Sequence, residues 1–274
     1  MASWLKAVVI DKTQWNPRLF SLRVQISGRE EPESNESDAQ GPGADAQTNS
    51  SETPDFSFTA GQFVRVGLDI DGERVARPYP LVNVPDTDYL EIYFNIVPEG
   101  PLSPKLAELN AGEELYIAER ANGFLVVNEV PECRHLWMLA TGTGVGPFLS
   151  ILGSGDAWKR FDKVVLAYCV RDQSELSYSE QIAELAGEYA DNFSFVPLVT
   201  RESVDGALNQ RITDAIRDGS MEDLAGIRIS ADESHVMMCG NSDMISDVSE
   251  LLVERGMKKH LRRDPGHYTT EKYH

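Results

Sequence analysis

One stretch of the chain, residues 136–151, combines residue types that suit a phosphate-binding turn. It reads LWMLATGTGVGPFLSI: five apolar residues, three glycines in a G-x-G-x-G-P pattern, and then an apolar helical pattern. Glycines leave backbone N–H groups open to a ligand, and the N-terminus of the following helix favours negative charge. Proline suits the first helical position, where its missing N–H would have no partner. We interpret the stretch as a strand–turn–helix unit that cradles a pyrophosphate.

Two other interpretations of this stretch remain open. Its spacing departs from the usual G-x-G-x-x-G dinucleotide pattern, and no G-K-[ST] follows as it would in a P-loop. Residues 136–155 carry no charged side chain, as in a membrane span, but the central glycines and proline disfavour a span. A tight strand–helix connection without a ligand would also fit the pattern.

Arginines follow two strand-like runs in the second half of the chain. Arg171 comes directly after YCV, Arg201 comes directly after LVT, and Arg211 opens the next helical stretch. A guanidinium pairs with phosphate oxygens through two parallel hydrogen bonds, which suits the 2′-phosphate of NADP. We therefore expect NADP(H) rather than NAD(H), although Asp172 weakens the case and surface ion pairing would also explain the arginines.

A second candidate site lies in the first half. Arg77-Pro78-Tyr79-Pro80 opens a strand-like run that ends at Asn83, and the turn at 100–104 precedes a short helix predicted over 105–110. Ser103 fits the N-cap of that helix, with Pro104 at its first position. A tyrosine beside an arginine suits a flat ring that carries a phosphate. The alternative is an ordinary turn and helix cap.

The elements that would position these residues follow from hydrophobic periodicity. Apolar residues alternate with polar ones around 20–27, 64–70 and 90–96, which predicts half-buried strands and an antiparallel sandwich or barrel in the first 130 residues. After the glycine turn, strand-like runs at 163–170, 193–200 and 235–239 alternate with helical patterns at 178–189 and 243–255. This alternation predicts a doubly wound α/β domain with a parallel sheet.

We place the domain boundary near 130, which gives an antiparallel barrel at 1–130 and an α/β domain at 131–274. Residues 28–55 interrupt the barrel with eight acidic residues and, proline aside, no aliphatic or aromatic residue larger than alanine until Asp55. Such a segment buries too little apolar surface to offset its ordering entropy, so we expect a disordered insertion, with a recognition arm as the alternative.

Composition limits the function further. The formal net charge is -19, which disfavours nucleic acid and anionic membranes as partners. The three cysteines are scattered without a C-x-x-C motif, so we expect no metal site and no iron–sulfur cluster. With no targeting signal recognised at the N-terminus, we expect a reducing, cytoplasmic location.

Five motifs in a fixed order make the chain resemble the bacterial ferredoxin/flavodoxin–NADP(H) reductases over nearly its whole length, apart from the insertion. That family combines an FAD-binding antiparallel barrel with an NADP-binding α/β domain, which is the organisation predicted above. The motifs are R-x-Y-x-L-x-N from Arg77, G-x-L-S-x-x-L from Gly100, A-T-G-T-G-x-G-P from Ala140, C-G-N-x-x-M from Cys239, and H-L-R-R-x-P-G-H-x-T-x-E-x-Y from His260.

The resemblance implies roles for individual residues. Tyr79 would stack on the flavin, Cys239 would lie near the hydride-transfer site, Glu271 would relay protons, and Tyr273 would shape the flavin and nicotinamide sites. The other residues implied in cofactor binding are Arg77, Pro78, Pro80, Phe94, Pro101, Leu102, Ser103, Thr143 and Gly144 for FAD, Arg171, Thr200, Arg201 and Arg211 for the adenosine phosphate of NADP, Met237, Met238, Gly240 and Asn241 beside the nicotinamide, and His274 at the adenine.

Two positions depart from the family pattern. Pro80 stands where the family normally has a serine whose hydroxyl and N–H face the flavin edge, and proline offers neither donor. His274 stands where related enzymes carry an aromatic residue that stacks on the adenine. We expect Pro80 to alter the flavin potential or the rate of hydride transfer.

The implied activity is FAD-dependent electron transfer between NADPH and ferredoxin or flavodoxin, by a chain that we expect to be monomeric. Because such carriers are acidic, a basic cluster is needed for docking, and we expect it at Lys258, Lys259, His260, Arg262 and Arg263; a helix C-terminal charge cluster is the alternative. Two other functions remain possible: a flavin reductase or diaphorase that serves an oxygenase, and a non-enzymatic flavin- and NADPH-binding redox sensor.

Overall fold

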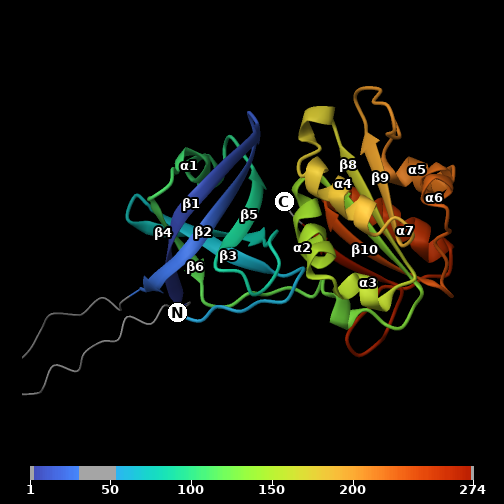
Figure 1. Ribbon diagram of the computed structural model, residues 1–274, viewed down its shortest axis with the longest axis horizontal. Helices are drawn as coiled ribbons and strands as arrows, with labels where there is room; N and C mark the ends of the chain where they lie inside the picture. Colours follow the sequence, from blue (N-terminus) through green and yellow to red (C-terminus); the bar gives the residue numbers. More distant parts are fainter. Residues whose placement is uncertain (1–2, 31–53, 273–274) are drawn as a thin grey trace, which may run out of the picture.

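The computed structural model describes residues 3–30 and 54–272 and contains two sheets that lie side by side (Figure 1). The first is a six-stranded antiparallel sheet, and the second is a five-stranded parallel sheet with helices on both faces. The predicted fold class, an antiparallel barrel followed by a doubly wound α/β domain, is therefore confirmed.

The first sheet has the strand order β4-β3-β6-β1-β2-β5 and curls into a barrel. Its two edge strands meet after β4 ends, where Leu81 pairs with Ile92 and the Val82 N–H donates to the Glu91 carbonyl at 2.9 Å. The strands are β1 (Trp4–Asn16), β2 (Leu19–Arg29), β3 (Phe63–Ile70), β4 (Glu73–Pro80), β5 (Leu90–Asn95) and β6 (Glu114–Ala118), and the helix is α1 (Ser103–Glu108).

The second sheet has the order β11-β10-β7-β8-β9, with all strands parallel. The apolar run of β7 is buried on both faces, since Leu136 and Met138 join one core while Trp137 and Leu139 join the other. The strands are β7 (His135–Thr141), β8 (Lys163–Val170), β9 (Phe193–Val199), β10 (Ser234–Gly240) and β11 (Tyr268–Lys272).

Six α-helices cover the two faces of the parallel sheet within the described residues. Those that contribute to the first core are α2 (Gly146–Ser154), α3 (Asp156–Arg160) and α4 (Ser179–Glu188). Those that contribute to the second core are α5 (Ile212–Arg217), α6 (Ser220–Ala225) and α7 (Ser242–Glu254), and Figure 1 shows them on the side of the sheet away from the barrel. Short 3-10 turns occur at Val127–Glu129, Gly142–Val145 and Gln173–Glu175.

The predicted elements agree closely with the structure in the α/β half. β8 spans 163–170, and α4 and α7 begin and end within one residue of the predicted ranges. In the barrel, the run from Arg77 is strand only as far as Pro80 rather than to Asn83. Most of the acidic insertion, residues 31–53, lies outside the described residues, and the domain limits at 130 and 131 stay predictions.

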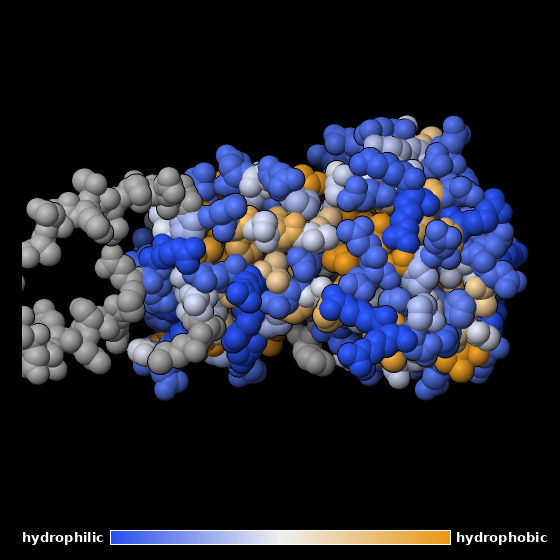
Figure 2. All heavy atoms as spheres, turned by 90° about the horizontal axis from the view of Figure 1, so that it is seen from below, coloured by the Kyte–Doolittle hydropathy of each residue, from blue (hydrophilic) through white to orange (hydrophobic). Residues whose placement is uncertain are grey.

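Within the described residues, no helix has the length and apolar character that a membrane crossing requires. The predicted alternative of a span at 136–155 is therefore wrong, because β7, a 3-10 turn and α2 divide that stretch. Figure 2 shows one face of the molecule, on which hydrophilic residues predominate and apolar residues gather towards the middle.

Candidate functional site

A pocket of ≈ 380 Å³ lies where the end of β4 and the β5 strand meet the glycine turn of the α/β domain. It brings together residues from both halves of the chain, because Thr143 and Lys272 complete a wall that is otherwise formed by the barrel. Its lining residues are Arg77, Pro78, Tyr79, Pro80, Tyr93, Phe94, Asn95, Val97, Gly100, Pro101, Leu102, Ser103, Thr143 and Lys272.

Tyr79 and Arg77 provide an aromatic face and a positive charge in this pocket. The ring of Tyr79 packs edge-on against Phe94, with ring centroids 5.8 Å apart. Burial raises the pKa of Tyr79 to about 12, although the positive charge of Arg77 opposes the shift. The phenol is therefore neutral at pH 7, and Arg77 is exposed to solvent. A flat ring bound on Tyr79 would have a guanidinium within the same pocket.

Pro80 is buried at the end of edge strand β4, opposite Phe63 of β3. Both backbone groups of Phe63 bond to Asn122 at 2.8 Å, so the Phe63–Pro80 pair is not a hydrogen-bonded pair of the ladder. The backbone nitrogen of Pro80 therefore points away from β3, and the proline removes no sheet hydrogen bond. What it removes is a donor on the outer edge of β4, which borders the pocket.

Ser103 does not cap α1, so the predicted N-cap is wrong. The N-cap residue is Leu102, which forms no side-chain cap hydrogen bond. Ser103 is the first helical residue, so the helix starts two residues before the predicted 105, and it ends at Glu108. The Ser103 hydroxyl instead accepts the Val97 N–H at 2.9 Å and is buried. It thereby fixes the loop after β5, which also lines the pocket.

The glycine turn packs tightly against the end of β10. A Cβ at Gly144 would lie 2.4 Å from the carbonyl oxygen of Cys239, and a Cβ at Gly146 would lie 3.2 Å from Pro80 in the barrel. Position 144 therefore needs a glycine because the backbone of β10 approaches it closely. Position 146 needs a small residue because the barrel contacts it. Thr143 is the residue of the turn that reaches the pocket, and pyrophosphate binding by the turn stays a prediction.

The end of β10 carries four predicted site residues, all buried. Met237 packs in the core on the α2 side of the sheet and Met238 in the core on the α5 side, so their side chains lie on opposite faces. Gly240 has a φ of 127°, and a Cβ there would meet Thr141. The fifth residue, Asn241, caps α7 by accepting from the N–H groups of Asp243 and Met244.

Glu271 lies beside Cys239 and links the α/β domain to the barrel. The two residues are partners in the parallel β10–β11 register, and Glu271 Oε1 accepts the Phe124 N–H at 3.3 Å. A carboxylate is thus held at the end of the sheet near the predicted hydride-transfer site. Tyr273 and His274, also predicted in the site, lie outside the described residues.

The predicted phosphate-binding residues gather at the carboxyl ends of β8 and β9. The Arg201 N–H donates to the Arg171 carbonyl at 2.9 Å, and the Thr200 N–H donates to the Val170 carbonyl at 3.1 Å. Arg211 is the N-cap residue of α5, and its charge opposes the burial that raises the pKa of the Cys169 thiol to about 11. Ligands of doubly wound sheets bind at this edge.

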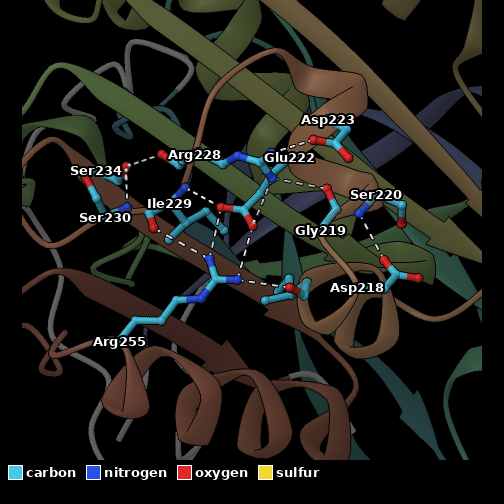
Figure 3. Close-up of polar contacts among 11 residues, drawn as sticks. Asp218, Gly219, Ser220, Glu222, Asp223, Arg228, Ile229, Ser230, Ser234 and Arg255 are labelled. Atoms are coloured by element: carbon cyan, nitrogen blue, oxygen red, sulfur yellow. Dashed lines mark hydrogen bonds and ion pairs between the residues drawn. The ribbon is translucent and has the colours of Figure 1, made fainter.

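An ion pair between the buried Glu222 and the half-buried Arg255 supports α6, the helix that follows the one capped by Arg211, and no sequence motif marks this pair (Figure 3). The carboxylate of Glu222 accepts two hydrogen bonds from Arg255, at 2.9 and 3.1 Å, and one from the Ile229 N–H at 2.6 Å. Arg255 also donates to the Ile216 carbonyl of α5 at 2.9 Å. Gln210, next to Arg211, donates to Ser220 at the start of α6.

A second polar network joins the two halves, also unidentified from the sequence. Tyr178, just before α4, donates to Glu91 of β5 at 2.7 Å, and its hydroxyl lies 2.5 Å from the Ser21 hydroxyl. Arg23 pairs with the other oxygen of Glu91 at 2.8 Å. Tyr93, which lines the pocket, donates to Ser177 at 2.9 Å. Glu91 lies on β5 between the apolar residues Leu90 and Ile92, so the alternating pattern gave no sign that its side chain is buried.

The described residues contain no group of three or more histidine, cysteine, aspartate or glutamate side chains arranged to hold a metal ion.

Two matches to protein families define the class of protein. Residues 48–119 match an oxidoreductase FAD-binding domain, and residues 138–250 match an oxidoreductase NAD-binding domain. Fold and site thus belong to a two-domain oxidoreductase with a flavin domain and a nicotinamide nucleotide domain.

Similar proteins narrow the class to a family. A flavodoxin/ferredoxin–NADP reductase of Escherichia coli is 42% identical over 100% of both chains, and a ferredoxin–NADP reductase of Azotobacter vinelandii is 35% identical over 80% of this chain and 88% of its own. A ferredoxin NADP+ reductase from Neisseria gonorrhoeae, solved with FAD and NADP, has a TM-score of 0.84 at 27% identity and 99% coverage of both chains. The chain belongs to the flavodoxin/ferredoxin–NADP reductase family, as the sequence motifs implied.

Proposed function

We propose that this chain binds FAD and uses it to transfer electrons between NADPH and ferredoxin or flavodoxin. The observation that carries the proposal is that one pocket joins Tyr79 and Arg77 of the barrel to the glycine turn. The arginine cluster, which consists of Arg171, Arg201 and Arg211, lies at the same edge of the parallel sheet. Membership of the reductase family supports it. Bound FAD would supply the conversion between hydride transfer and one-electron transfer.

The protein groups would bind and orient this cofactor. The ring of Tyr79 offers a stacking face, the Arg77 guanidinium offers a charge for a phosphate, and the 100–103 turn offers a wall held by the Ser103–Val97 hydrogen bond. Glu271, fixed beside Cys239, is the carboxylate available to hold or move a proton. Arg171, Arg201 and Arg211 would select the 2′-phosphate of NADPH over NADH.

The anaerobic visible spectrum tests this function. The purified protein is expected to be yellow and to bleach rapidly with NADPH and much more slowly with NADH. A colourless protein would contradict the FAD site. A yellow protein that bleaches equally fast with both nucleotides would contradict the choice of NADPH, and one that neither nucleotide bleaches would contradict the reductase activity.

For the carrier, we propose a docking surface around Phe124 and the loop after α7. Phe124 is 55% exposed, Leu261 is 56% exposed, and the Arg262 guanidinium lies 4.1 Å from the centre of the Phe124 ring. Phe124 also adjoins Glu271, so a carrier bound there would reach the end of β11. Exposed apolar residues with basic neighbours suit an acidic protein partner.

The charges available at this docking surface differ from the simple cluster that the sequence predicted. Lys258 pairs with Asp264, and Arg262 pairs with Glu129 at 2.8 Å. Within the described residues, neither Lys259 nor Arg263 forms an ion pair, and both are exposed. These two side chains are therefore the ones free to meet carboxylates of a partner.

Charge reversal at single positions tests the docking surface. Lys259→Glu and Arg263→Glu should each raise the KM for reduced or oxidised ferredoxin several-fold and leave NADPH oxidation by ferricyanide unchanged. Arg217→Glu changes the charge by the same amount on α5, on the side away from the barrel (Figure 1), and should have no effect. An equal effect of all three variants would show that only total charge matters.

The predicted monomeric state, cytoplasmic location and lack of nucleic-acid or membrane partners stay predictions.

A further inference from the structure

We propose that Glu175 is a positioning residue for the 2′-phosphate of the nicotinamide nucleotide, because its carboxylate holds one edge of the Arg171 guanidinium and leaves the opposite edge to the phosphate. This inference rests on the proposed function, in which Arg171 binds that phosphate. It adds a residue that does not touch the ligand and acts through the orientation of another side chain.

The contact between the two residues is made on one side of the guanidinium. Glu175 Oε1 accepts from Arg171 Nε at 3.0 Å and from Nη2 at 2.5 Å, and Oε2 accepts the Arg171 backbone N–H at 3.0 Å. Within the described residues, Nη1 of Arg171 donates to no protein group. A guanidinium has five N–H donors in a planar fork, so the Nη1 side can still form paired hydrogen bonds with phosphate oxygens.

Glu175 is itself held in place by its backbone. Its carbonyl accepts the hydroxyl of the fully buried Tyr168 at 3.0 Å and the Ser177 N–H at 2.8 Å. Its own N–H donates to the Asp172 carbonyl at 2.9 Å, which closes the 3-10 turn Gln173–Glu175. The side chain of Glu175 is 15% exposed, whereas that of Arg171 is 49% exposed. A fixed carboxylate thus restrains a side chain that would otherwise move in solvent.

The charges around the pair favour this role over simple competition with the phosphate. Partial burial acts to raise the pKa of Glu175, but the hydrogen bonds from Arg171 and the charge of Arg201 outweigh burial and lower that pKa below its ordinary value. Glu175 is therefore ionised at pH 7 and paired. Arg201 and Arg211 add two further positive charges at this edge, opposite the carboxylates of Asp172 and Glu202, so an incoming phosphate still meets three guanidinium groups.

The consequence concerns one chemical group of the ligand. A flexible arginine loses conformational freedom when it binds, and prior orientation removes part of that loss, which is worth about tenfold in affinity. A nucleotide without the 2′-phosphate makes no use of the oriented edge. Removal of the Glu175 carboxylate should therefore weaken binding of a 2′-phosphorylated adenosine and leave the unphosphorylated compound unaffected.

Calorimetric titration of the yellow holoprotein with two small probes tests this inference. The probes are adenosine 2′,5′-bisphosphate and adenosine 5′-monophosphate, and the variants are Glu175→Gln and Glu175→Ala. Both variants should raise the Kd of the bisphosphate about tenfold and change the Kd of the monophosphate less than twofold. Glu184→Gln removes the same charge from an exposed position of α4 and serves as the matched control.

Each other result overturns the inference. Tighter bisphosphate binding by Glu175→Gln would mean that the carboxylate competes with the phosphate, and an unchanged Kd would mean that Arg171 needs no support. Equal weakening for both probes would mean that Glu175 only maintains the loop. If the unaltered protein does not prefer the bisphosphate, the NADP(H) preference of the proposed function fails with it; if it does, only the role of Glu175 is at stake.

Discussion

Position 80 shows how one residue can alter chemistry without altering the fold. Because the Phe63–Pro80 pair carries no ladder hydrogen bond, the substitution Pro80→Ser should leave the sheet intact and add an N–H and a hydroxyl at the pocket edge. A new hydrogen bond to the flavin is worth about 1 kcal/mol, or roughly fivefold in a rate or equilibrium. We therefore expect a changed visible spectrum and a several-fold change in the rate of reduction by NADPH.

The readouts for Pro80→Ser are stopped-flow reduction and the midpoint potential of the flavin. Pro17→Ser, in the exposed turn between β1 and β2 and outside the pocket, provides the control for the loss of a proline from the barrel. If the spectrum, potential and rate of Pro80→Ser all match those of the unaltered protein, position 80 does not tune the flavin.

His235 predicts a pH dependence of stability. Burial, with a smaller contribution from the neighbouring His260, lowers the pKa of His235 to about 3, and Nε2 lies 2.9 Å from the Thr269 hydroxyl. In the unfolded chain the imidazole titrates near roughly 6.5. Between these two pKa values the unfolded chain binds a proton that the folded chain does not, so acidification favours unfolding.

The free energy of unfolding should therefore fall by up to about 1.4 kcal/mol per pH unit from this group as the pH drops from about 6.5 towards 3. Above about pH 7 the group contributes no slope. The difference between the unaltered protein and His235→Gln, measured by urea unfolding at several pH values, isolates this contribution from that of the carboxylates. Parallel pH curves for the two proteins would disprove it.

At the level of single residues, the sequence indicated those with a distinctive type at a motif position. Tyr79, Arg77 and Thr143 do line one pocket, and the arginines at 171 and 201 do follow adjacent strands. The sequence did not reveal which arginine is held by a carboxylate, because Glu175 acts through a 3-10 turn whose geometry depends on Tyr168. Ser103 likewise stands at a position typical of a helix cap, but its hydroxyl accepts the Val97 N–H, a contact that depends on the fold of the loop after β5.

The helices α5 and α6 form a unit whose position depends on the pair of Glu222 and Arg255. Glu222 is only 4% exposed, so its charge is tolerated because Arg255 and the Ile229 N–H compensate for lost hydration (Figure 3). Arg228 pairs with Asp223 at 2.6 Å on the outer side of the same helix. The unit carries Arg211 at its start, so a loosened α6 also affects the arginine cluster.

Removal of one partner tests this unit. Arg255→Met should leave the buried Glu222 with only Arg228, 3.9 Å away, as a cation and lower the free energy of unfolding by up to about 3 kcal/mol. Glu254→Gln alters the neighbouring, exposed position and should lower it by less than about 0.5 kcal/mol. Chemical denaturation of both variants provides the measurement, and equal stability of the two would show that the buried pair contributes little.

The sequence predicted elements best where their hydrophobic pattern was long and regular. α4 and α7 have one apolar face each, and β8 is an uninterrupted apolar run, so all three were located within about one residue. β11 and α6 are short and carry polar or acidic residues, so periodicity gave no signal for them. β11 forms an edge of the sheet because of its pairing with β10, which is a contact between distant parts of the chain.

At the scale of the molecule, Tyr178 connects the two halves. It lies before α4 and bonds to Glu91 and Ser21 of the barrel, with Trp15 packed 4.4 Å from its ring. Tyr178→Phe should remove both hydrogen bonds, leave one oxygen of the buried Glu91 without its partner, and cost about 1–3 kcal/mol of stability. The sequence predicted the two-domain fold but could not show this network, because the network depends on how the two halves are placed relative to each other.

Differential scanning calorimetry distinguishes a connecting role for Tyr178 from a local one. If the network couples the halves, Tyr178→Phe should broaden or split the unfolding transition, whereas Tyr189→Phe at the end of α4 should leave it single. A uniform fall in Tm with an unchanged shape of the transition would mean that Tyr178 stabilises the barrel face without coupling the domains.

The net charge of -19 and the proposed docking surface have opposite effects on binding of an acidic carrier. The total charge repels the carrier at long range, while Lys259 and Arg263 attract it at contact. The Debye length shortens to about 10 Å at about 0.1 M salt, so moderate salt screens the repulsion before it weakens close pairs.

We therefore expect kcat/KM for ferredoxin reduction to rise with salt, reach a maximum near about 0.1 M, and then fall. In the double variant Lys259→Glu, Arg263→Glu the falling limb should be absent, because both local attractions are lost and salt can then only relieve repulsion. A steady fall from the lowest salt in the unaltered protein would show that the local basic charges dominate at all distances.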